Sequence, residues 1–249
     1  MMKTSNKILL SFFGLILLTK TIILFGIGKN INGDDALAND EKVGNAEQQR
    51  NLPPFNKIDI ENKFRVHYTQ DTFQNVVVKA DSNLVNLAIT VVRDGQLFIH
   101  STKRLRSRQY IDVYVTNDSL NEVKSNAGGL FKTLNKMKVF HFNGIGEAGA
   151  IFQMDGNYTN LSLNFTAGCV SDLSGNCQNI DIESNTGCVI NASNLIVNKG
   201  RVSASTGAVS NLNITGELSL ALSTGAVVKC QGNPQIKSIS ISTGAQFIK

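Results

Sequence analysis

The stretch "STGAVVKCQGNPQIKSISISTG", residues 223–244, begins and ends on the same three residues. Similar triplets occur earlier in the chain, and each of them ends in a glycine. These glycines are Gly149, Gly168, Gly187, Gly207, Gly225 and Gly244, at intervals of 19, 19, 20, 18 and 19 residues. A fixed period of this length is typical of repeat architectures, in which each unit is stacked on the next.

Positions at a fixed offset from each glycine share a chemical character. The residue after it is always small: Ala150, Cys169, Cys188, Ala208, Ala226 and Ala245. The fifth residue after it is always apolar, and turn formers then follow in "DGN", "SGN", "ASN" and "QGN", which predicts a second turn in each unit. Because one such unit cannot bury its apolar face alone, the units must stack. We therefore predict an all-β fold, a single-stranded parallel β-helix with coils of about 19 residues, and corner glycines with positive φ.

The chain before this repeat also alternates between apolar and polar residues, but less regularly. "KIDIENKFRVHYTQ" and "YIDVYVT" alternate as half-buried strands do, and Asp94-Gly95 predicts a hairpin. Residues 82–90 predict a short helical turn. We assign residues 55–249 to one head domain, with less regular strands over 55–125 and regular coils over 126–249. The polar segment 39–54 is interpreted as a linker.

The N-terminal segment 1–38 predicts export. A basic start, "MMKTSNK", precedes an apolar run from residue 8, and Ala36-Leu37-Ala38 fits a signal-peptidase site. The alternative is an uncleaved membrane anchor over residues 8–28, which is long enough to span a bilayer. Without 1–38 the formal charge falls from +5 to +3, because 20 basic residues then face 17 acidic ones. This small surplus argues against nucleic-acid binding.

A resemblance to a known family rests on the N-terminus that predicts export, on the coils that end in "STGA", and on the stretches "FNKIDIENKFRVHYTQ" and "VVVKADSNLVNLAITVVRDGQLFIHS". With these features, the chain resembles the auto-transporter adhesin head domains, also called the head GIN domain family. The resemblance covers residues 55–249. It implies a right-handed single-stranded β-helix in the envelope of Gram-negative bacteria, with a role in adhesion and no established chemistry. The motifs are patterns of strands and glycines rather than catalytic signatures.

The four cysteines are interpreted as mostly structural. Cys169 and Cys188 occupy the same corner of adjacent coils, where small buried side chains are the favoured reading and a disulfide is the alternative. Cys230 is expected in the core, whereas Cys177, after the "SGN" turn, is expected to be exposed. The spacing of the four does not resemble a zinc site.

An enzymatic function would need clustered carboxylates with a basic partner, as in carbohydrate-active β-helices. Asp181 and Glu183 point outward from one strand, and Arg201 lies one coil away, so these three are the candidate catalytic residues. A cross-strand charge pair between Asp181 and Arg201 is the favoured reading. The remaining outward positions of this strand are rich in Ser and Asn, which also suits hydrogen bonding to glycans.

Two further groups of residues are candidate binding sites. His67, His100 and His141 alternate with apolar neighbours and are expected to face outward, with a shared metal as the less favoured alternative. The basic run "KRLRSR", residues 103–108, is expected to be a solvated loop, with contact to anionic glycans as the alternative.

These observations favour an exported, non-enzymatic protein of the periplasm or cell surface that uses a β-helix in adhesion or glycan contact. The alternatives are a polysaccharide lyase or hydrolase and a purely structural envelope component. We expect no cofactor, no metal and no nucleic acid. The expected partners are surface glycans or another envelope protein, and the membrane is met only through the N-terminal segment if it is uncleaved.

Overall fold

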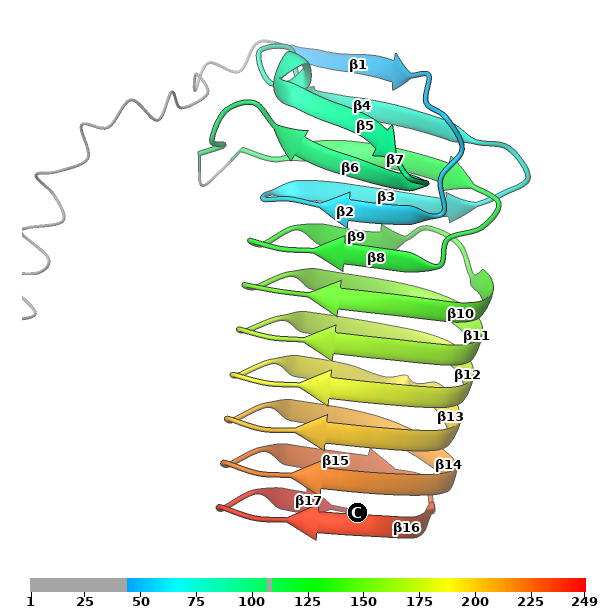
Figure 1. Ribbon diagram of the computed structural model, residues 1–249, viewed down its shortest axis with the longest axis vertical. Helices are drawn as coiled ribbons and strands as arrows, with labels where there is room; N and C mark the ends of the chain where they lie inside the picture. The colour runs from blue at the N-terminus through cyan, green and yellow to red at the C-terminus, as the bar shows by residue number, and fades with distance from the viewer. Residues whose placement is uncertain (1–43, 107–108) are drawn as a thin grey trace, which may run out of the picture. The chain divides into compact units, whose positions relative to one another are not determined.

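The computed structural model describes residues 44–106 and 109–249, so the predictions for segment 1–38 lie outside the described residues. The described chain is almost entirely β, apart from a short 3-10 helix, η1, over Val85–Leu87. Parallel strands stack about 19 residues apart and form a β-solenoid of about seven turns, which confirms the predicted architecture (Figure 1). No helix among the described residues is long and apolar enough to cross a membrane.

The regular coils are built from long strands that each pair in parallel with the next. They are β10 (Met137–Gly146), β11 (Ile151–Phe165), β12 (Val170–Ser184), β13 (Val189–Ala204), β14 (Val209–Leu222), β15 (Val227–Gln231), β16 (Gln235–Ile241) and β17 (Gln246–Ile248). Figure 1 shows β11 to β14 folded into two legs, and the carboxyl-terminal half of each strand forms the front leg. Residues at equivalent positions of successive coils therefore lie above one another: Ser162 pairs with Asp181, and Asp181 pairs with Arg201.

The second turn of each unit differs from the prediction. In β11 and β12 the ladder continues through the expected turn, because Gly156 pairs with Gly175 and Asn157 pairs with Asn176. The chain bends there without leaving the sheet. From β11 to β16, a break at this turn separates two strands only between β15 and β16, where Gly232 has a φ of 88°.

The corner glycines have positive φ, as predicted, with values from 70° at Gly187 to 80° at Gly149. The residue before each glycine also has positive φ, for example 52° at Thr206, which the sequence pattern does not predict. No heavy atom lies within 4 Å of where a Cβ on these corner glycines would stand. The corner therefore requires glycine for its backbone conformation and not for close packing.

The N-terminal part of the head does not stack in chain order. Its strands are β1 (Asn45–Arg50), β2 (Lys57–Ile60), β3 (Phe64–Gln70), β4 (Asn75–Asp81), β5 (Ala88–Arg93), β6 (Gln96–Ser101), β7 (Ile111–Asn117), β8 (Glu122–Ser125) and β9 (Leu130–Thr133). The coil of β2 and β3 lies between β6–β7 and β8–β9, with parallel pairing on both sides. Strands β1, β4 and β5 pair antiparallel and cover this end of the solenoid. The predicted hairpin at Asp94-Gly95 joins β5 to β6.

Strand β1 departs from the sequence interpretation, which placed residues 45–50 in a linker. It pairs antiparallel with β4 along its whole length, from Asn45 opposite Asp81 to Arg50 opposite Val76. Its residues are polar apart from Ala46, and none of them is fully buried. The strand is held by backbone pairing at the edge of the sheet, so its sequence carries no apolar alternation that could reveal it.

Buried aliphatic and aromatic side chains fill the space between the two legs of the coils. The rings of Phe152 and Phe165 lie 4.9 Å apart, centroid to centroid. All four cysteines are buried free thiols, so the disulfide alternative for Cys169 and Cys188 is not formed. Cys230 is in the core as predicted, whereas the expectation for Cys177 was wrong: it is 4% exposed. The bend that follows "SGN" keeps Cys177 in the ladder opposite Tyr158 and facing inward.

Candidate functional site

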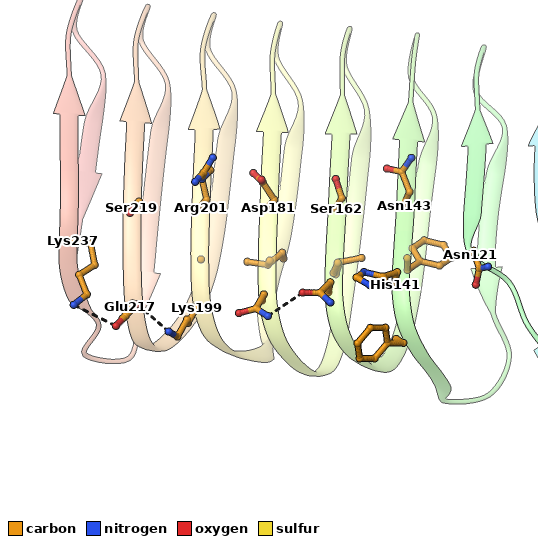
Figure 2. A pocket seen from close by; sticks show the side chains of 17 residues that line it. Asn121, His141, Asn143, Ser162, Asp181, Lys199, Arg201, Glu217, Ser219 and Lys237 are labelled. Atoms are coloured by element: carbon orange, nitrogen blue, oxygen red, sulfur yellow. Dashed lines mark hydrogen bonds and ion pairs between the residues drawn. The ribbon is translucent and has the colours of Figure 1, made fainter.

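A groove of about 910 Å³ runs along the front legs of the regular coils and crosses β10 to β14 and β16. Most of its polar lining comes from two outward ladders, each with one residue per coil (Figure 2). The first ladder is His141, Asn160, Asn179, Lys199 and Glu217. The second ladder is Asn143, Ser162, Asp181, Arg201 and Ser219. Strand alternation places both ladders on the outer face, because the residues between them point into the core.

Hydrogen bonds and ion pairs link neighbouring coils along the first ladder. The Asn179 amide Nδ2 donates to Asn160 Oδ1 at 3.0 Å. Lys199 Nζ and Lys237 Nζ each lie 3.3 Å from a carboxylate oxygen of Glu217. Hydrogen bonds from Lys199 and then Lys237 lower the pKa of Glu217, so this carboxylate is ionised at neutral pH.

The second ladder holds two of the three candidate catalytic residues. Asp181 and Arg201 are paired in the ladder, as the sequence predicted, and both are exposed. The expected charge pair is not closed, however, because the two side chains form no ion pair within 4.0 Å among the described residues. In Figure 2 they lie side by side with their polar ends free.

Glu183, the third candidate, lies apart from the groove. It is exposed two residues beyond Asp181 on β12, and it does not line the groove. Its carboxylate accepts a hydrogen bond from Asn164 Nδ2 at 3.3 Å. The structure therefore brings Asp181 and Arg201 together along the groove and leaves Glu183 in the neighbouring row.

An exposed aromatic ring stands at one end of the groove, and the sequence analysis missed it. Phe140 is 67% exposed, and its ring meets the ring of His141 edge to face at a centroid distance of 4.5 Å. Alternation would place Phe140 inside with Phe142, but only Phe142 is buried. Phe140 has no partner in the register of β10 and β11, which skips from Val139 to His141. No signal in the sequence marks this irregularity.

The three histidines do not form a site. His67 faces outward but is half-buried: its Nε2 lies 2.7 Å from Asp112 Oδ1, and its ring stacks on Tyr114 at 4.7 Å. Burial disfavours the charged form of Asp112, but hydrogen bonds from His67 and Arg65 outweigh it and lower the pKa of this carboxyl. Within residues 44–106 and 109–249, no group of three His, Cys, Asp or Glu side chains could hold a metal.

The basic run 103–108 is only partly described, because residues 107–108 lie outside the described residues. Lys103 and Arg104 are exposed, as a solvated loop predicts, whereas Leu105 is 6% exposed and packs into the core. This run does not line the groove.

A family model described as "Putative auto-transporter adhesin, head GIN domain" matches residues 54–234. The chain belongs to this family. The match begins just before β2 and ends between β15 and β16, and it contains the groove except for Lys237. A comparison with curated proteins gives no match.

Solved structures share the fold of this head GIN domain protein at low identity. A "putative adhesin" from Bacteroides fragilis NCTC 9343 is 20% identical, with a TM-score of 0.71 over 85% of this chain and 97% of that one. A "putative adhesin" from Parabacteroides distasonis ATCC 8503 is 15% identical, with a TM-score of 0.69 over 86% and 99%. A "Putative lipid binding protein" from the same organism is also 15% identical, with a TM-score of 0.64 over 86% and 98%.

Proposed function

We propose that this protein is an exported, non-enzymatic module of the cell envelope or cell surface that binds glycans along the front-leg groove. The observation that carries the proposal is the pair of outward ladders, which repeat amide, hydroxyl and charged groups once per coil. Parallel strands repeat about every 4.8 Å, so the groove offers a regular series of hydrogen-bonding positions. A polysaccharide carries hydroxyl groups on every sugar, so it can form hydrogen bonds at successive positions of this series.

The exposed ring of Phe140 supports this assignment. Aromatic side chains contribute large apolar contact at one end of a binding surface, and a sugar ring has an apolar C–H face that can lie on them. Among the large apolar side chains that the structure describes, Phe140 is the most exposed at 67%, and it borders the polar ladder at His141. An exposed aromatic ring beside amides and hydroxyls suits a ligand that is apolar on its faces and polar on its edges.

Membership of the head GIN domain family supports a surface role, because the description of the family names an auto-transporter adhesin. Export itself is proposed from residues 1–38, as a cleaved signal peptide or as an anchor over residues 8–28. N-terminal sequencing of the mature protein separates these two: a start at Asn39 supports secretion, and an intact Met1 supports anchoring.

Binding of the purified head to a glycan array, followed by calorimetry on the best glycan, tests the groove. We expect Phe140→Ala to weaken binding about two- to twelvefold, the equivalent of about 0.5–1.5 kcal/mol for one aromatic contact. Phe73→Ala is the matched control, because Phe73 is 56% exposed on the β3–β4 loop and does not line the groove. Equal effects of the two substitutions would overturn the assignment of the groove.

A second pair of variants probes the polar ladder with the same readout. Asn179→Ala removes the amide that donates to Asn160 within the groove, and we expect it to weaken glycan binding. Asn191→Ala removes a similar cross-coil hydrogen bond, to Asp172 at 3.2 Å, on the back leg of the coil. If both variants bind as the wild type does, the ladder is not the contact surface.

The non-enzymatic part of the proposal has its own test. The head is incubated with each bound polysaccharide, and released oligosaccharides are measured by chromatography. We expect no release from the wild type. Release that is lost in the double variant Asp181→Ala, Glu183→Ala would establish a carbohydrate-active enzyme instead.

A further inference from the structure

Charged side chains are gathered at one end of the groove. Lys199, Arg201 and Lys237 supply three positive charges, and Asp181 and Glu217 supply two negative ones, so the lining carries 3 − 2 = +1 with His141 neutral. The opposite end, around Phe140, carries amides, a hydroxyl, aromatic rings and the aliphatic side chain of Leu161. A ligand that extends along the groove therefore meets a neutral half and a charged half.

The positive charges in the charged half are not all neutralised. Lys199 and Lys237 share the single carboxylate of Glu217, at 3.3 Å each, so two cations face one anion. Arg201 is exposed, and its guanidinium makes no hydrogen bond or ion pair with the described residues. Figure 2 shows its nitrogen atoms at the free end of the side chain, beside Asp181 and one row above Lys199.

Arg201 and Lys199 are placed to act together on one acidic group. They are two residues apart on β13, so both side chains stand on the same face of the strand. A guanidinium binds a carboxylate through two parallel N–H donors, and a lysine ammonium adds a point charge. The Ser219 hydroxyl is the ladder neighbour of Arg201 on the next coil and can donate to the same group.

We propose that the groove selects acidic glycans, and that a sugar carboxylate of the uronic or sialic acid class binds at Arg201 with Lys199 beside it. This inference rests on the proposed function of the groove. Asp181 then limits the acidic preference and sets the position of the anion, because its carboxylate lies beside Arg201 in the ladder and repels a bound carboxylate. The acidic sugar therefore sits toward β14, away from Asp181, and the neutral sugars of the chain extend toward Phe140.

The test compares acidic glycans with carboxyl-reduced forms of the same chains, with oligogalacturonate and its reduced form as the calorimetric probes. We expect the wild type to bind the acidic form at least fivefold more tightly. Arg201→Ala should abolish this preference, Arg201→Lys should retain part of it, and Asp181→Asn should increase it. Lys229→Ala, an exposed lysine on the back leg of β15, is the control for unspecific charge and should leave the preference unchanged.

The possible outcomes separate this inference from the proposed function. If the head binds neutral and carboxyl-reduced glycans as tightly as acidic ones, the acidic preference is overturned while glycan binding in the groove stands. The assignment of the carboxylate to Arg201 is likewise overturned if Lys229→Ala lowers the preference as much as Arg201→Ala. If an array of neutral, uronic and sialic glycans gives no binding at all, both the proposed function and the inference are overturned.

Discussion

At the corner of each coil, two consecutive residues adopt positive φ, and only the second is glycine. Thr206 has a φ of 52° and Gly207 has a φ of 72°. A β-branched residue is strained in this region, whereas asparagine tolerates it. The sequence pattern identified the glycine, because glycine is the usual marker of positive φ. It could not identify the threonine, whose preferences point to extended backbone.

This geometry predicts opposite effects for two substitutions at one corner. Gly207→Ala should lower the free energy of unfolding by about 1–2 kcal/mol, the cost of a left-handed alanine, because no atom is near enough to clash with the added methyl group. Thr206→Asn should raise it by up to about 1 kcal/mol through relief of strain. Urea denaturation measures both. If Gly207→Ala has the same free energy of unfolding as the wild type, the corner does not depend on positive φ.

The Asp112 cluster predicts a pH dependence of stability. The folded-state pKa of Asp112 is lowered by hydrogen bonds from His67 and Arg65, which outweigh its burial. A carboxyl with a depressed pKa stabilises the fold above its usual pKa of 3.8 and loses this contribution as the pH falls through the folded value. Asp112→Asn should therefore cost up to about 1 kcal/mol at pH 7 and much less at pH 2–3.

The control for this prediction is Asp172→Asn, an exposed aspartate on β12. Thermal unfolding is followed across the pH range for the wild type and both variants. If the unfolding temperatures of the wild type and of Asp112→Asn differ by the same amount at every pH, the result would contradict the role of this cluster.

At the level of the strands, the inner faces carry a few hydroxyl groups among apolar side chains. Ser184 is 0% exposed on β12, and its hydroxyl has no hydrogen-bond partner. Its ladder neighbours are Phe165 and Ala204, so the site already accepts an alanine one coil away. A buried hydroxyl without a partner costs about 1–3 kcal/mol relative to a bonded one.

Ser184→Ala should therefore raise the free energy of unfolding by about 1 kcal/mol. The matched control is Ser203→Ala on the outer face of β13, where the hydroxyl is exposed to water and no change is expected. Urea midpoints of the two variants are compared with the wild type. A loss of stability in Ser184→Ala would mean that its hydroxyl is bonded within the core.

The elements also show what the sequence could predict. The outward register of Asp181 and Arg201 followed directly from the spacing of the glycines, because a constant period puts equivalent residues on adjacent coils. The bend that keeps Cys177 buried did not follow, since turn formers such as "SGN" are equally compatible with a turn that leaves the sheet. The exposed Phe140 depends on a local slip in the register of β10, which alternation cannot reveal.

On the scale of the described head, stacking order and chain order agree only in the regular coils. The placement of β2 between β6 and β8, and of β3 between β7 and β9, depends on pairing between segments that are far apart in sequence. No periodicity specifies such a pairing, so the sequence predicted strands over 55–125 without their arrangement. The groove is likewise a property of the stack, because its lining comes from six strands of the regular coils and from Asn121 before β8.

The two ends of the described head differ, and this predicts a gradient of stability. Strands β16 and β17 pair with earlier coils on one side only, and Ile239 and Ile241 are 50% and 43% exposed. In a stack where each coil contacts only its neighbours, an outer coil opens first. Amide hydrogen exchange should therefore be faster in β16 than in β12. Equal protection of the two strands would indicate that the last coil is covered in solution.

The groove and its ligand both depend on one property of the molecule, that equivalent residues lie directly above one another. The distance between spin labels tests it directly, since the four native cysteines are buried and new surface cysteines can be labelled in their presence. With one label at Asn143→Cys, a second at Ser219→Cys should lie about 19 Å away, and one at Ser238→Cys about 24 Å away, because each coil adds about 4.8 Å. An increase of about one coil spacing between the two pairs supports the stack, and distances that do not grow with coil number would contradict it.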